Sequence, residues 1–104
     1  MRRPLLTLHG TYDALLPIRV TSDAYRRLVE AAGAAPLHRY YRFEGGNHVD
    51  GLVDAFPDRL RPLLPCYRAA FIALEEWVEH GVEPPPSDTV ARPPAGDRSG
   101  SQLR

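Results

Sequence analysis

The sequence predicts an α/β fold in which strands alternate with helices along a parallel sheet. Two short segments, residues 4–8 and 37–43, have the length and residue types of strands. Each precedes a segment whose apolar residues recur every three or four positions, as on one helix face. The order strand, helix, strand, helix implies parallel strands joined by right-handed crossovers. Because two parallel strands do not make a stable sheet, we expect neighbouring strands on the N-terminal side.

The first strand and the first helix are bounded by clear local signals. The strand ends at His9-Gly10, a turn typical of the exit from a buried parallel strand, and His9 is expected to buttress that turn. The helix should begin at Thr21 or Ser22, because a hydroxyl there can accept a hydrogen bond from a free N–H group of the first turn. Gly33 ends it. Its apolar stripe consists of Ala24, Tyr25, Leu28, Val29 and Ala32.

The second strand and the last helix are equally well delimited. Tyrosine and phenylalanine in residues 37–43 favour a strand, and the glycine-rich residues 44–47 then form a flexible turn. The last helix should begin near Pro62 or Pro65 and end at Gly81. Its helical stripe, expected to lie in the core, consists of Leu64, Tyr67, Phe71, Leu74 and Val78.

The composition limits the kind of protein this can be. Of 104 residues, 1–83 are expected to fold, and the Pro-, Ser- and Arg-rich residues 84–104 are expected to be a disordered tail. Thirteen basic and thirteen acidic residues cancel, so nothing favours nucleic acid, and no apolar run is long enough to span a membrane. The single cysteine, Cys66, excludes an intrachain disulfide and a cysteine-built metal site. The sequence does not indicate a compartment.

The most informative pair of residues is Asp13 and His48, each placed a few residues after a predicted strand. The carboxyl ends of parallel strands meet at one edge of a sheet, so the two side chains should converge there. A carboxylate that orients an imidazole, which then acts as a general base, is the arrangement of serine-type acyl transfer. Either residue alone could be an ordinary polar residue of a turn. Together they predict a triad acid and its base.

Residues 6–13, 16–17 and 44–48 carry a resemblance to the closing part of the α/β-hydrolase superfamily. Members of that superfamily have a strand ending in His-Gly-x-x-Asp and, later, a glycine-rich turn leading to the catalytic histidine. Residues 74–84 are similar to the last helix of bacterial esterases of the tannase and feruloyl-esterase kind. The resemblance covers about residues 4–83. It implies a partial α/β-hydrolase fold, comprising the last strands and helices of the sheet, with Asp13 as acid and His48 as base.

The resemblance also implies a serine nucleophile, and the chain offers none. No Gly-x-Ser-x-Gly elbow is present, and in this superfamily the serine precedes the acid and the base. It would therefore lie upstream of Met1. Neither Ser22, expected at a helix cap, nor the serines of the tail are suitable substitutes. Tyr12, Leu15 and Leu16 are expected to border the substrate pocket.

We therefore expect the C-terminal part of a serine carboxylic-ester hydrolase, inactive alone and needing no cofactor or metal. Its partner would be a small ester, once an upstream segment completes the site, and an amide or peptide substrate stays open. One alternative is a truncated, non-enzymatic remnant or an interaction module. It would use its unpaired sheet edge for a partner or for self-association. Another is a split enzyme whose nucleophile half is a separate chain.

Overall fold

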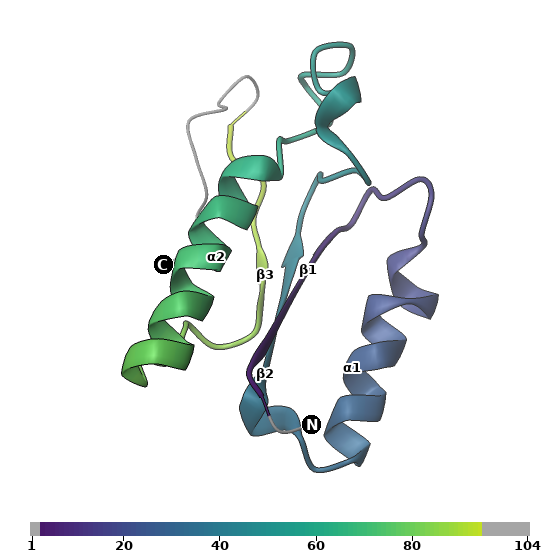
Figure 1. The fold of residues 1–104 in the computed structure, drawn as a ribbon. Helices are drawn as coiled ribbons and strands as arrows, with labels where there is room; N and C mark the ends of the chain where they lie inside the picture. The colour runs from purple at the N-terminus through teal and green to yellow at the C-terminus, as the bar shows by residue number, and fades with distance from the viewer. Residues whose placement is uncertain (1–2, 95–104) are drawn as a thin grey trace.

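The computed structural model describes residues 3–94 and has three strands and two α-helices in this part. Their bounds are β1 Leu5–Gly10, α1 Ser22–Ala31, β2 His38–Phe43, α2 Leu64–His80 and β3 Asp88–Val90. The strands form one parallel sheet in the order β1-β2-β3, which confirms a small partial α/β fold (Figure 1). No helix of residues 3–94 has both the length and the apolar character needed to cross a bilayer.

The two helices lie on opposite faces of the sheet (Figure 1). Successive side chains of a strand point to opposite faces, and β2 shows both directions. On one face the Tyr40 hydroxyl donates a hydrogen bond to Asp23 of α1 at 2.7 Å. On the other face the Arg39 guanidinium lies 4.9 Å from the ring centre of Trp77 of α2. This central strand is therefore covered on both sides. The core on the α2 side consists of Tyr41, Phe43, Leu63, Cys66 and Ala70.

The strand β3 lies in a segment that was predicted to be disordered. It pairs with β2 in the register Tyr41–Asp88 to Phe43–Val90, within the range 84–104 that the sequence assigned to the tail. Just before it, the Tyr41 hydroxyl donates to the Pro85 carbonyl at 2.6 Å. Local composition missed this strand because its ladder partners are more than 40 positions away. The rest of that prediction, residues 95–104, lies outside the described residues.

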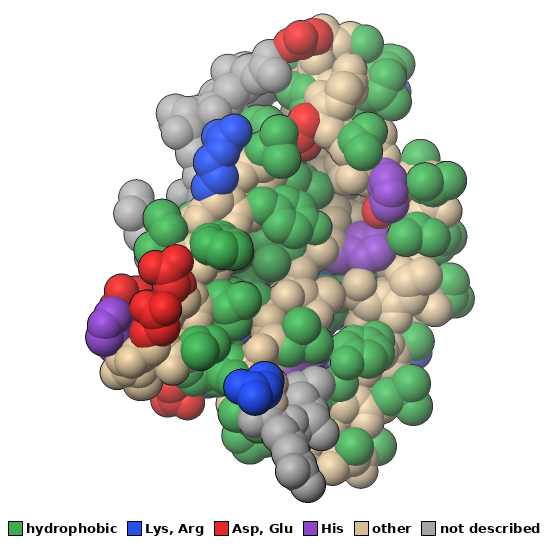
Figure 2. All heavy atoms as spheres, in the orientation of Figure 1, with side chains coloured by type: hydrophobic (Ala, Val, Ile, Leu, Met, Phe, Trp, Pro, Cys, Tyr) green, Lys and Arg blue, Asp and Glu red, His purple; other side chains and the backbone are tan. Residues whose placement is uncertain are grey.

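The prediction for the buried face of α2 was wrong. The buried residues are Cys66, Ala70 and Trp77, whereas Phe71 is 68% exposed and Val78 58% exposed. The middle of the predicted stripe, Tyr67, Phe71 and Leu74, instead borders the side of β1 that has no neighbouring strand among the described residues. There, a shallow cavity of about 140 Å³ is lined by apolar side chains of β1 and α2. Figure 2 shows hydrophobic side chains gathered on this face.

Candidate active site

The carboxyl ends of β1 and β2 are held together by a close approach of two glycines. A Cβ atom added to Gly10 would lie 2.2 Å from the carbonyl oxygen of Gly46, so only glycine fits there. Two backbone hydrogen bonds join the same segments, from Thr11 N to Phe43 O at 3.0 Å and from Tyr12 N to Gly46 O at 2.8 Å. The loops after the two strands are therefore in direct contact.

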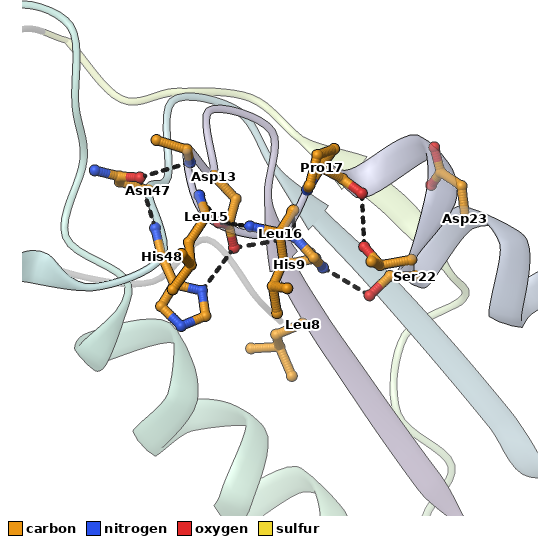
Figure 3. A network of polar contacts seen from close by, with 12 residues as sticks. Leu8, His9, Asp13, Leu15, Leu16, Pro17, Ser22, Asp23, Asn47 and His48 are labelled. Carbon is orange, nitrogen blue, oxygen red and sulfur yellow. Dashed lines mark hydrogen bonds and ion pairs between the residues drawn. The ribbon is translucent and has the colours of Figure 1, made fainter.

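This contact brings Asp13 and His48 together, as the sequence analysis expected. The Nδ1 atom of His48 lies 3.0 Å from Oδ2 of Asp13 (Figure 3). A carboxylate only accepts hydrogen bonds, so the proton of a neutral His48 ring is on Nδ1. Its Nε2 is then unprotonated and makes no hydrogen bond to any of residues 3–94. The Asp13 side chain is 6% exposed and that of His48 38%, so the imidazole is partly open to solvent whereas the carboxylate is buried.

The carboxylate of Asp13 accepts three hydrogen bonds and lies beside a second imidazole. Its Oδ1 accepts the backbone N–H groups of Leu15 at 2.9 Å and Leu16 at 2.7 Å. Its Oδ2 is shared between His48 and Nε2 of His9, the latter at 3.1 Å. Burial raises the pKa of the Asp13 carboxyl, but the hydrogen bonds from Leu16, His48 and Leu15 outweigh burial, and the pKa lies below its ordinary value. The acid therefore stays ionised at neutral pH.

His9 is a second imidazole on the same carboxylate. Its side chain is 8% exposed, and its Nε2 faces two acceptors, Asp13 Oδ2 and the Leu16 carbonyl at 2.9 Å. Nε2 must therefore carry a proton, and in the neutral ring Nδ1 accepts from the Ser22 hydroxyl at 2.7 Å (Figure 3). His9, the predicted buttress, thus lies against Asp13 itself, and its other partner, Ser22, comes from the start of α1.

Two further side chains hold the loop that carries His48. Oδ1 of Asn47 accepts the backbone N–H groups of Ala14 at 3.0 Å and of His48 at 2.8 Å, which links the acid loop to the base loop. The carboxylate of Asp50 accepts the two N–H groups at the start of α2, at 2.7 and 3.0 Å. Asn47 was not among the predicted site residues, and its position directly before His48 was the only sequence signal for its role.

A cavity of about 160 Å³ opens beside the two catalytic candidates, Asp13 and His48. Leu16, one of the three residues predicted to border a substrate pocket, lines this cavity together with Tyr67 of α2. Tyr12 instead lines a neighbouring cavity of about 610 Å³. Leu15 is 67% exposed and lines neither cavity; it contributes its backbone N–H to Asp13.

No serine of the described residues is hydrogen-bonded to His48. The Ser22 hydroxyl is bonded to His9, and that of Ser87 accepts the backbone N–H of Tyr40 at 2.8 Å. Ser99 and Ser101 lie outside the described residues. Residues 3–94 also contain no group of three or more His, Cys, Asp or Glu side chains placed to hold a metal ion.

The chain is thus a small parallel α/β unit with a carboxylate and an imidazole in hydrogen-bond contact at the carboxyl edge of its sheet. The comparisons with known proteins are more specific. The family model for 3HB-oligomer hydrolase matches residues 1–103, and the chain belongs to that family. The match supports a hydrolase family, but not the narrower likeness to tannases and feruloyl esterases.

Several curated relatives carry the name D-(-)-3-hydroxybutyrate oligomer hydrolase. The chain is 31% identical to that of Cupriavidus metallidurans over 98 residues, 31% to one of Ralstonia pickettii over 102, and 33% to that of Cupriavidus pinatubonensis over 98. These matches cover 90%, 95% and 90% of this chain, but 14% of each relative. No solved structure matches significantly.

Proposed function

We propose that this chain supplies the acid and the base of a serine-type ester hydrolase of the α/β-hydrolase fold that acts on oligomers of 3-hydroxybutyrate. The hydrogen bond between Asp13 and His48 is the observation that carries the proposal. The relatives' printed name supplies the substrate class. We therefore narrow the expected substrate class from small esters in general to linear esters of a hydroxy acid.

In the proposed reaction, Nε2 of His48 takes the proton of a serine hydroxyl as that oxygen attacks the ester carbonyl. The same nitrogen then gives the proton to the departing alcohol, and the cycle repeats with water to release the acid. Asp13 keeps the proton on Nδ1 and stabilises the imidazolium that forms. The serine and the donors that stabilise the developing negative charge would come from outside residues 1–104.

We place the segment that would carry the serine beside the open side of β1. In residues 3–94 this strand pairs only with β2, and apolar side chains of β1 and α2 remain uncovered beside it. A further parallel strand would complete the backbone hydrogen bonds of β1 and cover these side chains. The same edge could bind a second copy of the chain, which a concentration-dependent change in mass by light scattering would reveal.

A chimaera tests the catalytic proposal directly. The matched segment of the Cupriavidus metallidurans relative is replaced by residues 1–103 of this chain, and release of 3-hydroxybutyrate from its linear dimer is measured. The chimaera should be active. Asp13→Asn and His48→Ala should each lower kcat by about a thousandfold or more, as loss of a triad member does.

Two substitutions at exposed positions serve as matched controls. Asp58→Asn and His80→Ala change the same residue types away from Asp13 and His48, which we call the dyad. Both controls should leave kcat unchanged. Thermal melting of each variant shows whether it is folded. A folded, active chimaera that tolerates His48→Ala would overturn the proposed function.

A further inference from the structure

The larger cavity beside the dyad contains two arginines that the proposed mechanism does not use. It has a volume of about 610 Å³, within the range of about 300–1,000 Å³ typical of small-molecule sites. Arg59 and Arg92 line it together with the apolar side chains of Leu52, Phe56 and Leu60. The cavity is therefore apolar along one part and cationic at another.

Both arginines lie beside the turn that leads to His48, Arg92 with its side chain and Arg59 with its backbone. A Cβ atom added to Gly45 would lie 2.6 Å from Cδ of Arg92 and 3.2 Å from the backbone oxygen of Arg59. The Arg92 side chain thus passes over Gly45, in space that only a glycine leaves open. Since Gly45 also has a φ of +81°, which favours glycine, this turn is suited to that packing.

The side chains of Arg59 and Arg92 have no carboxylate at ion-pair distance within the described part of the chain. In residues 3–94 neither guanidinium forms an ion pair, although Arg26, Arg39 and Arg42 each pair with a carboxylate. The nearby Glu44 carboxylate interacts with the backbone N–H of Arg92, at 3.5 Å. Two arginines that line one partly apolar cavity favour an anionic ligand with an apolar body.

The arginine cavity and the cavity beside Asp13 and His48 are neighbours that share one lining residue. Asn47 lines both, and its side chain is bonded to the backbone N–H of His48 (Figure 3). Tyr12, which precedes Asp13, lines the arginine cavity. A ligand anchored by the arginines could therefore extend past Asn47 towards Nε2 of His48.

We propose that Arg59 and Arg92 bind the terminal carboxylate of the oligomer whose ester bond the dyad would cleave, an inference that rests on the proposed function. A linear oligomer of 3-hydroxybutyrate has one free carboxylate and a methyl group on every unit. The carboxylate matches the guanidiniums, and the methyl-bearing body matches Leu52, Phe56 and Leu60. The site thus selects free oligomer acids over their neutral esters.

Binding to the purified chain tests this inference without requiring catalysis. The linear dimer of D-3-hydroxybutyrate and its methyl ester are titrated into the labelled chain and followed by amide NMR shifts. The acid should bind about tenfold or more tightly than the methyl ester, since a charged hydrogen-bonded pair is lost in the ester. Arg59→Gln and Arg92→Gln should each remove most of this preference.

Arg27→Gln is the matched control, because Arg27 is exposed on α1 and lines neither cavity. Equal binding of acid and ester, no binding of either, or an equal loss in Arg27→Gln would overturn the inference. In the chimaera, Arg59→Gln should raise KM for the acid about tenfold without changing kcat. An unchanged KM there would overturn the carboxylate site alone, whereas tolerance of His48→Ala would overturn the catalytic role alone.

Discussion

Gly10→Ala should separate the two loops that form the candidate site. The new Cβ would lie 2.2, 2.3 and 2.8 Å from O, C and Cα of Gly46, all backbone atoms that cannot rotate away. Ordinary contact begins at 3.4 Å, so the segments must part by about 1.2 Å. Overpacking of this kind costs about 1–3 kcal/mol, and loss of the Tyr12–Gly46 hydrogen bond adds about 1 kcal/mol. The total is a large share of the roughly 5–15 kcal/mol that stabilises a typical domain.

Urea unfolding of the purified chain measures this loss, and the NMR signal of the His48 Nδ1 proton reports whether its bond to Asp13 survives. Gly51→Ala is the matched control, because nothing beyond its chain neighbours lies within 4 Å of its added Cβ. Gly10→Ala should lower the free energy of unfolding by about 2–4 kcal/mol relative to Gly51→Ala and should weaken the Nδ1 signal. Equal stabilities for the two variants would refute the argument.

Three further predictions concern the polar groups around the site. The lowered pKa of Asp13 means that its ionised form stabilises the fold above the ordinary carboxyl pKa of about 3.9, and that this contribution is lost as pH falls through the folded-state pKa. The difference in unfolding free energy between the natural chain and Asp13→Asn should therefore shrink between about pH 5 and pH 2, and a constant difference would contradict this. Asp50→Ala should lower the free energy of unfolding by about 1–2 kcal/mol, because two N–H groups at the start of α2 lose their acceptor, whereas the exposed Asp58→Ala should not. Ser22→Ala should cost about 1–3 kcal/mol in the same assay, because the buried Nδ1 of His9 loses its donor, and unchanged stability would contradict the assigned ring proton.

Helix-period patterning correctly located α2 but not its buried face. Its regular stripe, which includes Phe71, is exposed, whereas the less regular set of Cys66, Ala70 and Trp77 packs on the sheet. A repeat of apolar residues shows that a helix has an apolar side, but not which neighbour covers it. Here the stripe faces the open side of β1, where the described residues provide no cover.

The sequence by itself determined the order of the elements and the placing of Asp13 and His48, because strand and helix periods, prolines and turn glycines act locally. Only the tertiary structure decided that His9 shares the carboxylate, that Asn47 joins the two loops, and that a short strand follows α2. It also placed Arg59 and Arg92 around one cavity. Most of these features depend on contacts between residues far apart in the chain, and such contacts leave no periodic trace in the sequence. His9 and Asp13 are only four positions apart, but the turn after β1, which has no repeating pattern, brings their side chains together.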